Sequence, residues 1–217
     1  MKKILLKDVC QKFSNSSAPF IDQLSMEIHA GEIWGILGHN GSGKTTLLKS
    51  LCGILPHEGT CTLDQTVLEE LSPKQLARLV SYIPQRSGIS IDISALDVVL
   101  MGFNPQLGLL EHPTKAMQQT AMDALAQVGL AEKAHTNYMH LSEGQKQLCI
   151  MARTLVAGSK LLLLDEPESA LDFHYRYKIL SLLRNWVTQS HSSATILSWR
   201  SITATTYCCL QKVMFWV

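Results

Sequence analysis

One short segment of the chain, "GILGHNGSGKTTLLKSLCG" at residues 35–53, limits what the protein can fold into. The apolar run that leads into it, residues 32–37, has a length that suits a strand. The next residues, "HNGSG", have the composition of a loop. In the following "KTTLLKSLC" three leucines recur at helical spacing, and Gly53 is a plausible C-cap. The segment therefore predicts a strand, a glycine-rich loop and a helix in succession.

The loop has the spacing Gly-x-x-x-x-Gly-Lys-Thr over residues 38–45, which is that of the phosphate-binding loop of P-loop NTPases. Its glycines let several backbone N–H groups point at one centre, and the helix that follows adds its N-terminal dipole. Lys44 would bring a full charge to the β- and γ-phosphates, and Thr45 a hydroxyl for Mg²⁺. The alternative is a glycine-rich turn beside a surface lysine, which the flanking strand and helix disfavour.

A second informative stretch, "KLLLLDEPESALD", spans residues 160–172. Four consecutive leucines are typical of a strand buried on both faces of a parallel sheet, and Pro167 stops the pairing. Ligands bind at the carboxyl ends of such strands, which is where Asp165 could hold Mg²⁺ and Glu166 could polarise an attacking water. An acidic turn without function is the alternative, and the presence of the phosphate loop makes it the weaker interpretation.

Between these two stretches, "HLSEGQKQLCIMARTLVAG" covers residues 140–158. Ser142 can cap a helix, the apolar residues recur at helical spacing, and Gly158 can close it. The pattern predicts a capped amphipathic helix, but it explains neither Gly144 nor the polar residues of the first turn.

Length and charge narrow the class of protein. With 217 residues the chain can form one domain with a subdomain, and its net charge of +1 argues against a broad nucleic-acid surface. No run approaches 18 apolar residues, and the apolar stretch in the first ten residues is too short for a signal peptide. We therefore expect a cytoplasmic protein.

The cysteines and histidines show no metal-site spacing. None of the six cysteines forms a Cys-x-x-Cys pair, and most lie in apolar surroundings. None of the eight histidines forms a ligand pair at helical spacing with a supporting acid. We interpret the cysteines as small buried residues in a reducing compartment.

The motifs resemble those of the nucleotide-binding subunit of ATP-binding cassette (ABC) transporters, in that family's order, over about residues 4–197. "GHNGSGKT" resembles Walker A, Gln85 in "SYIPQ" the Q-loop glutamine, and "LSEGQ" the signature LSGGQ. "LLLLDEP" resembles Walker B with its catalytic glutamate, and "SALD" at residues 169–172 resembles the D-loop. Phe13 lies where the family often has an aromatic residue that stacks on adenine.

The resemblance implies an α/β fold, a P-loop NTPase core with a mixed or parallel sheet flanked by helices, plus an inserted α-helical subdomain. We expect one ABC ATPase domain over residues 1–217, with the core at 1–85 and 145–217 and the helical subdomain at 86–144. Within that insert, "TKAMQQTAMDALAQVGL" predicts an amphipathic helix closed by Gly129.

The resemblance also implies a mechanism in which two such domains pair head to tail, with each ATP between Walker A of one and the signature of the other. Glu166 would be the general base, with Lys44 and Gln85 as further catalytic residues. Thr45, Gln85 and Asp165 would hold Mg²⁺. The nucleotide contacts implied are Phe13, Gly38, Asn40, Gly41, Ser42, Gly43, Lys44, Thr45, Thr46, Ser142, Gly144, Gln145 and Asp172.

The stretch from "ALDVVLMGF" to "DALAQVGL" is similar to the ATPases that power importers of iron–siderophore complexes, haem and cobalamin. Importers of molybdate, zinc or manganese share much of it, and a generic helical subdomain is the alternative. The implied partners are a second copy, membrane permease subunits and indirectly a substrate-binding protein, but no nucleic acid, at the inner face of the cell membrane. Two other hypotheses stay open: a soluble ABC ATPase of DNA repair or iron–sulfur assembly, and a catalytically impaired ATP-binding subunit.

Two departures from the family pattern matter. Glu143 replaces the first glycine of the signature, and we expect its side chain to point away from the nucleotide. The strand-like "SSATILS" is followed by no histidine, although the family has one there that touches the γ-phosphate. From about residue 199 the chain is atypical, which puts the family's last strand and helix in doubt and would leave residues 213–217 poorly covered. We favour a truncated, frame-shifted end over a degenerate ATPase.

Overall fold

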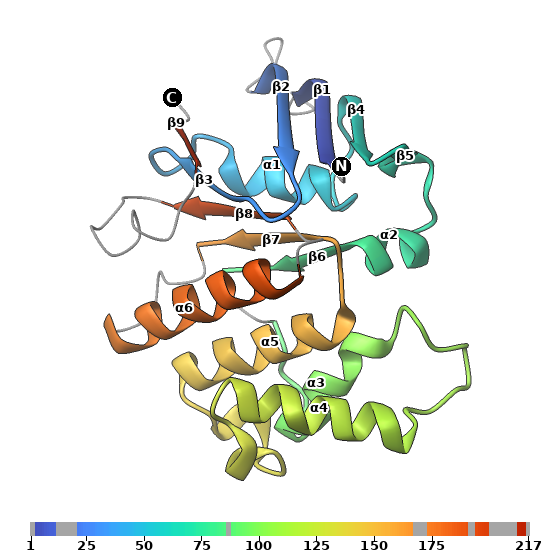
Figure 1. Cartoon of the computed structure of the whole chain (residues 1–217), viewed down its shortest axis with the longest axis vertical. Helices are drawn as coiled ribbons and strands as arrows, with labels where there is room; N and C mark the ends of the chain where they lie inside the picture. The colour runs from blue at the N-terminus through green and yellow to red at the C-terminus, as the bar shows by residue number, and fades with distance from the viewer. Residues whose placement is uncertain are drawn as a thin grey trace.

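The computed structural model of the chain describes residues 3–11, 21–85, 88–166, 173–190, 194–199 and 212–215. Two β-sheets and two groups of helices make up this part of the chain (Figure 1). The sequence predicted the α/β class, but it did not predict that the strands would divide into one parallel and one antiparallel sheet.

The larger sheet has five strands in the order β6-β7-β8-β3-β9, and every neighbouring pair is parallel. Strand β7, which pairs with β6 on one side and β8 on the other, is buried along its whole length, as four consecutive leucines predicted. The strand predicted before the glycine loop is β3, and the strand predicted from "SSATILS" is β8. The bounds are β3 (Ile33–Leu37), β6 (Val80–Ile83), β7 (Leu161–Asp165), β8 (Ala194–Trp199) and β9 (Lys212–Phe215).

The smaller sheet has the order β2-β1-β4-β5 and is antiparallel throughout. Its buried residues, among them Ile4, Leu6 and Ile28, share one hydrophobic core with α1 and with buried residues of the larger sheet. The bounds are β1 (Lys3–Gln11), β2 (Ile21–His29), β4 (Glu58–Leu63) and β5 (Thr66–Val67).

Helix α1 (Lys44–Leu51) lies between the two sheets, and its buried leucines share one core with both of them (Figure 1). The predicted end of this helix is confirmed. Cys52 is the C-cap and Gly53 follows it in the left-handed conformation, with φ of +70°. The Gly53 and Ile54 N–H groups donate to carbonyls of the last turn, those of Ser50 and Lys49.

The opposite face of the parallel sheet is covered by α5 and α6, and α5 in turn packs against α3 and α4 (Figure 1). The predicted helices are confirmed: α4 ends before Gly129, and α5 runs from an N-cap at Ser142 to a C-cap at Gly158. The helix bounds are α2 (Pro73–Leu79), α3 (Ala95–Leu100), α4 (Lys115–Gln127), α5 (Glu143–Ala157) and α6 (Phe173–Ser190), with 3₁₀ turns η1 (Leu68–Glu70), η2 (Met101–Phe103), η3 (Ala131–Lys133) and η4 (Tyr138–His140).

Every named element between β6 and α5 is helical, which is the region expected as the helical subdomain. The division into a core and an inserted subdomain stays a prediction. Among the described residues, no helix is both long enough and apolar enough to cross a bilayer.

The sequence put the last strand of the family in doubt, and this expectation is wrong for residues 212–215. They form β9, which pairs in parallel with β3 from Trp34↔Lys212 to Leu37↔Phe215. Backbone pairing with β3 needs no alternation of apolar and polar side chains, so the sequence carried little signal for it.

Candidate nucleotide-binding site

The glycine loop between β3 and α1 has the backbone conformation that its sequence predicts. Gly41 and Gly43 have φ of +82° and +92°, a region that other residues rarely adopt. Gly43 is also the N-cap of α1, so the helix begins directly at the loop. The N-terminal N–H groups of α1 therefore point out of the helix beside the loop, where they can bind an anion.

Lys44 is the first residue of α1, and its side chain turns back over the loop. Its ammonium donates to the carbonyl oxygens of Gly38 at 2.7 Å and His39 at 2.9 Å. The side chain is 4% exposed. These contacts fix the cation at the centre of the loop, and an ammonium has a third N–H donor for a phosphate oxygen.

Asp165, at the carboxyl end of β7, accepts hydrogen bonds from three hydroxyl groups. Thr45 donates to Oδ1 at 3.0 Å, Ser198 donates to the same oxygen at 2.7 Å, and Tyr82 donates to Oδ2 at 3.2 Å. Burial, followed by the Asp165 charge, raises the pKa of Tyr82 well above its usual range, so its hydroxyl stays a proton donor. The carboxylate is therefore held in one orientation beside the start of α1.

Glu166 follows Asp165 but has different partners. Its backbone is left-handed, with φ of +45°, which is uncommon for a residue with a side chain. Its N–H donates to Ser198 Oγ at 3.1 Å, and its Oε2 accepts from Gln85 Nε2 at 3.2 Å. The side chains of Asp165 and Glu166 therefore have different hydrogen-bond partners, although the two residues are adjacent in the chain.

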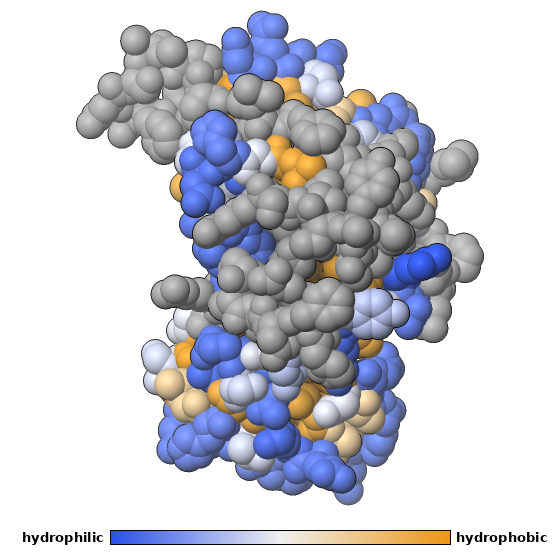
Figure 2. All heavy atoms as spheres, turned by 90° about the vertical axis from the view of Figure 1, so that its left-hand side faces the viewer, coloured by the Kyte–Doolittle hydropathy of each residue, from blue (hydrophilic) through white to orange (hydrophobic). Residues whose placement is uncertain are grey.

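The glycine loop and the residues around it enclose a pocket of about 410 Å³. The lining includes the loop and the first turn of α1 on one side, and Gln85 and Glu166 on the other. It lies at the edge of the sheet where the parallel strands end, the side of the molecule that Figure 2 turns toward the viewer. In that view the described residues at the top of the molecule are mainly hydrophilic, whereas those at the bottom are a mixture of hydrophilic and hydrophobic residues.

The site offers suitable ligands for Mg²⁺. Thr45 and Asp165 bring a hydroxyl and a carboxylate oxygen together, and both are oxygen donors of the kind that Mg²⁺ prefers. Within the described ranges, no group of three or more His, Cys, Asp or Glu side chains could hold a metal. A Mg²⁺ site needs no such group, because this ion is commonly bound by one or two protein ligands, phosphate oxygens and water. Gln85 contacts Glu166, and its role at the metal stays a prediction.

The signature residues form the start of α5. Ser142 Oγ accepts from the N–H of Gln145 at 3.3 Å, and the Gln145 side-chain oxygen accepts from the Ser142 N–H at 3.1 Å, which is a capping box. The side chain of Glu143 is 68% exposed and pairs with Lys146 at 2.9 Å. The Glu143 side chain therefore points out of the chain, and its predicted direction away from the nucleotide stays a prediction.

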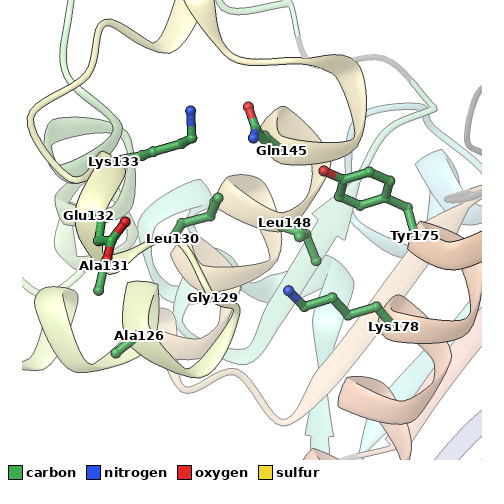
Figure 3. A pocket seen from close by; sticks show the side chains of 10 residues that line it. All are labelled: Ala126, Gly129, Leu130, Ala131, Glu132, Lys133, Gln145, Leu148, Tyr175 and Lys178. Atoms are coloured by element: carbon green, nitrogen blue, oxygen red, sulfur yellow. The ribbon is translucent and has the colours of Figure 1, made fainter.

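The structure explains Gly144, which the sequence pattern did not. A Cβ at this position would lie 2.7 to 2.8 Å from three ring atoms of Tyr175, on α6. The same ring lines a second pocket of about 360 Å³ together with Gln145 and Lys178 (Figure 3). Glycine is therefore required here because α6 packs directly against the first turn of α5.

The structure brings together most of the predicted site residues, but not all of them can be placed. Lys44, Thr45, Gln85 and Glu166 line one pocket, and Asp165 is hydrogen-bonded to Thr45 beside it. Ser142, Gly144 and Gln145 lie outside that pocket. Phe13, Asp172 and the rest of the predicted D-loop lie outside the described residues.

Sequence reasoning missed Tyr82 and Ser198. Each lies near the carboxyl end of a strand that neighbours β7. Polar side chains at such strand ends were the signal from which these two residues could have been predicted. The four cysteines within the described ranges are free thiols. Cys61 and Cys149 are buried as predicted, whereas Cys10 and Cys52 are only partly buried.

Comparison with known proteins agrees with this geometry. The family model described as ABC transporter matches residues 21–169. The ATP-binding protein of a manganese transport system from Listeria innocua is 38% identical over 167 residues, which is 76% of this chain and 68% of that protein. A hemin import ATP-binding protein from Rhizobium johnstonii is 36% identical over 197 residues, covering 87% of this chain and 74% of the relative.

Among solved structures, an inward-facing metal-chelate type ABC transporter matches with a TM-score of 0.85 and 29% identity, covering 100% of this chain and 80% of that one. The family match covers more than half of the chain and includes the phosphate loop, Gln85, the signature, Asp165 and Glu166. The chain therefore belongs to the ABC transporter family, as an ATP-hydrolysing ATP-binding subunit.

Proposed function

We propose that this chain powers an importer of a metal chelate, of the iron–siderophore, haem or cobalamin type, by binding and hydrolysing MgATP. The observation that carries the proposal is one pocket lined by Lys44, Thr45, Gln85 and Glu166, with buried Asp165 hydrogen-bonded to Thr45 beside it. The substrate class is supported by the relatives, which are named for manganese transport, hemin import and metal-chelate transport.

Within the site, each residue has a proposed task. Lys44 and the loop N–H groups bind the phosphates. Thr45 and Asp165 hold Mg²⁺, which would offset the charge that develops on the transferred phosphoryl group. Glu166 accepts a proton from the attacking water, and Gln85 fixes the Glu166 carboxylate through its amide.

The proposed working unit is a head-to-tail pair of copies. Ser142, Gly144 and Gln145 lie outside the pocket lined by the loop, Gln85 and Glu166, although they begin a helix whose N-terminus suits an anion. A second copy would bring these residues to the nucleotide. Closure around ATP and reopening after hydrolysis would then move the attached membrane subunits.

The proposed contact with a permease includes Leu109 and Leu110. They are 100% and 89% exposed, in the loop between η2 and α4. This loop is braced by α2: Lys74 donates to the Leu107 carbonyl and Arg78 to the Pro105 carbonyl. A braced loop that exposes two adjacent leucines is a suitable apolar contact for a permease at the inner face of the membrane.

The test is transport by a complex of this chain with the permease and binding protein encoded beside it, reconstituted in lipid vesicles. We expect ATP-dependent uptake of an iron chelate or haem, and no uptake with Glu166→Gln. Uptake of Mn²⁺ instead would contradict the substrate class and leave the importer assignment intact.

A separate measurement tests the permease contact. Leu109→Ser/Leu110→Ser should reduce co-purification with the permease while nucleotide binding is unchanged. Ile54→Ser is the matched control, because Ile54 is also an exposed apolar residue, at 57%. Co-purification that is equal in both variants would exclude this loop as the contact.

A further inference from the structure

Ser198 carries a buried hydroxyl that contacts Asp165 and Glu166 without lining the pocket, and neither the sequence motifs nor the proposed chemistry gives it a task. It is 0% exposed and lies on β8, directly beside Asp165 in the parallel register of β7 and β8. Its neighbours along the strand show which way it faces. Ile196 packs into the core around α1, whereas Leu197 packs into the core on the other face. Because strand residues alternate between faces, Ser198 points to the side of α1 and Thr45.

The hydroxyl of Ser198 makes two hydrogen bonds that join the two acids of the site. It donates its proton to Asp165 Oδ1 at 2.7 Å and accepts from the Glu166 N–H at 3.1 Å. The Ser198 carbonyl also accepts from the same N–H, at 3.3 Å. One residue therefore contacts the side chain of Asp165 and the backbone of Glu166.

The second contact matters because of the Glu166 conformation. A left-handed backbone at a residue with a side chain persists only where its surroundings hold it. At φ of +45° the chain leaves the direction of β7, and the Glu166 side chain reaches Gln85. Without the Ser198 hydroxyl, the N–H of Glu166 would lose the shorter of its two hydrogen bonds to Ser198.

We propose that Ser198 is a positioning residue of the ATPase site, which orients Asp165 for Mg²⁺ and holds Glu166 in its left-handed turn. The proposal rests on the tasks proposed above for Asp165 and Glu166. It assigns no contact between Ser198 and the nucleotide. Ser198 acts on the reaction through the two acids, as the outer partners of metal ligands do in other proteins.

The experiment compares three variants of Ser198 with the parent chain and a control. Ser198→Ala removes the hydroxyl, Ser198→Thr keeps it, and Ser198→Cys keeps the volume but offers only a weak donor. Thr195→Val is the matched control, because Thr195 is a buried hydroxyl of the same strand on the opposite face, with no hydrogen-bond partner for its Oγ1 among the described residues. ATP affinity is measured in EDTA and across a Mg²⁺ titration, and turnover is measured alongside.

We expect Ser198→Ala to bind ATP in EDTA within about two-fold of the parent, while its apparent Mg²⁺ affinity and its kcat fall by about 10- to 100-fold. Ser198→Cys should resemble Ser198→Ala, whereas Ser198→Thr should return most of the loss. Thr195→Val should behave as the parent.

Parent-like Mg²⁺ affinity and kcat in Ser198→Ala would overturn the proposal, and so would a Ser198→Cys variant that behaves as the parent, since volume alone would then suffice. If Ser198→Thr does not fold, the comparison of Ser198→Cys with the parent still tests whether the hydroxyl is needed. A parent chain that fails to bind MgATP would refute the proposed function first, and the Ser198 proposal with it, which is a distinct result visible before any variant is made.

Discussion

The Thr45 hydroxyl lies 3.0 Å from Asp165 Oδ1, although 120 positions separate the two residues in the chain. The contact joins the first turn of α1 to the end of β7, the two segments that carry the phosphate loop and the acids. A nucleotide bound at the first turn of α1 would therefore lie close to the acids at the end of β7. This proximity would allow the nucleotide and its metal ion to be bound together.

Lys44→Ala should remove ATP binding that calorimetry can measure. A charge-assisted hydrogen bond is worth up to about 3 kcal/mol, or about 100-fold in affinity, and the Gly38 and His39 carbonyls would also lose their donor. Lys49→Ala, on the same helix but outside the pocket, is the control. Near-normal affinity in Lys44→Ala would refute the phosphate-loop assignment.

Glu166→Gln should bind ATP normally and lose about 10²- to 10⁴-fold in turnover, because an amide cannot accept the proton of the attacking water. The amide oxygen can still accept from Gln85, so the pocket should keep its shape. We expect MgATP to trap a dimer visible by size exclusion. Glu70→Gln, an exposed acid on η1, serves as the control, and hydrolysis at the parent rate in Glu166→Gln would show that another group is the base.

Gly144→Ala should lower the stability by about 1–3 kcal/mol, because the added methyl group would overlap the ring of Tyr175. Moving the start of α5 should also weaken MgATP-driven pairing of two copies. Thermal unfolding and size exclusion measure these effects, with Gly88→Ala as the control because its Cβ would meet nothing within 4 Å. An unchanged midpoint of unfolding would mean that α6 can shift away from the added methyl group without loss of stability.

The buried thiols of Cys61 and Cys149 and the partly buried thiol of Cys52 should resist alkylation while the chain is folded. Burial raises the pKa of Cys61 and Cys149 to about 12 and that of Cys52 to about 11. At pH 8 fewer than about one in a thousand of these thiols is the reactive thiolate. Peptide mapping after iodoacetamide treatment should find them unmodified, and the same treatment in urea should label them. Rapid labelling of Cys61 in the folded chain would contradict its burial.

The chain should bind MgATP but turn it over slowly, because the residues after "SSATILS" include no histidine. In the family that histidine donates a hydrogen bond to the γ-phosphate, and such contacts are worth about 10²- to 10³-fold in rate. The test replaces the residues from Trp199 onward with a histidine-bearing, family-like tail. Equal and brisk rates in both proteins would show that the position needs no histidine.

Features with a local physical cause could be predicted from the sequence. Ser142 and Gly158 bound α5 because helix caps depend on neighbouring residues, and four leucines marked β7 because burial on both faces needs no particular partner. The contacts of Ser198 could not be predicted, because they depend on the register between β7 and β8. Gly144 is explained only by a ring from a different helix.

The order of strands in the parallel sheet has a consequence for synthesis on the ribosome. Strand β3 is completed early, yet Ile33 pairs with Thr195, so about 160 further residues must be added before that partner exists. At about 5–20 residues per second, both edges of β3 wait on the order of ten seconds for β8 and longer for β9. A nascent chain stalled before residue 194 would therefore present two open strand edges, which is the kind of surface that chaperones bind and that aggregates when they do not.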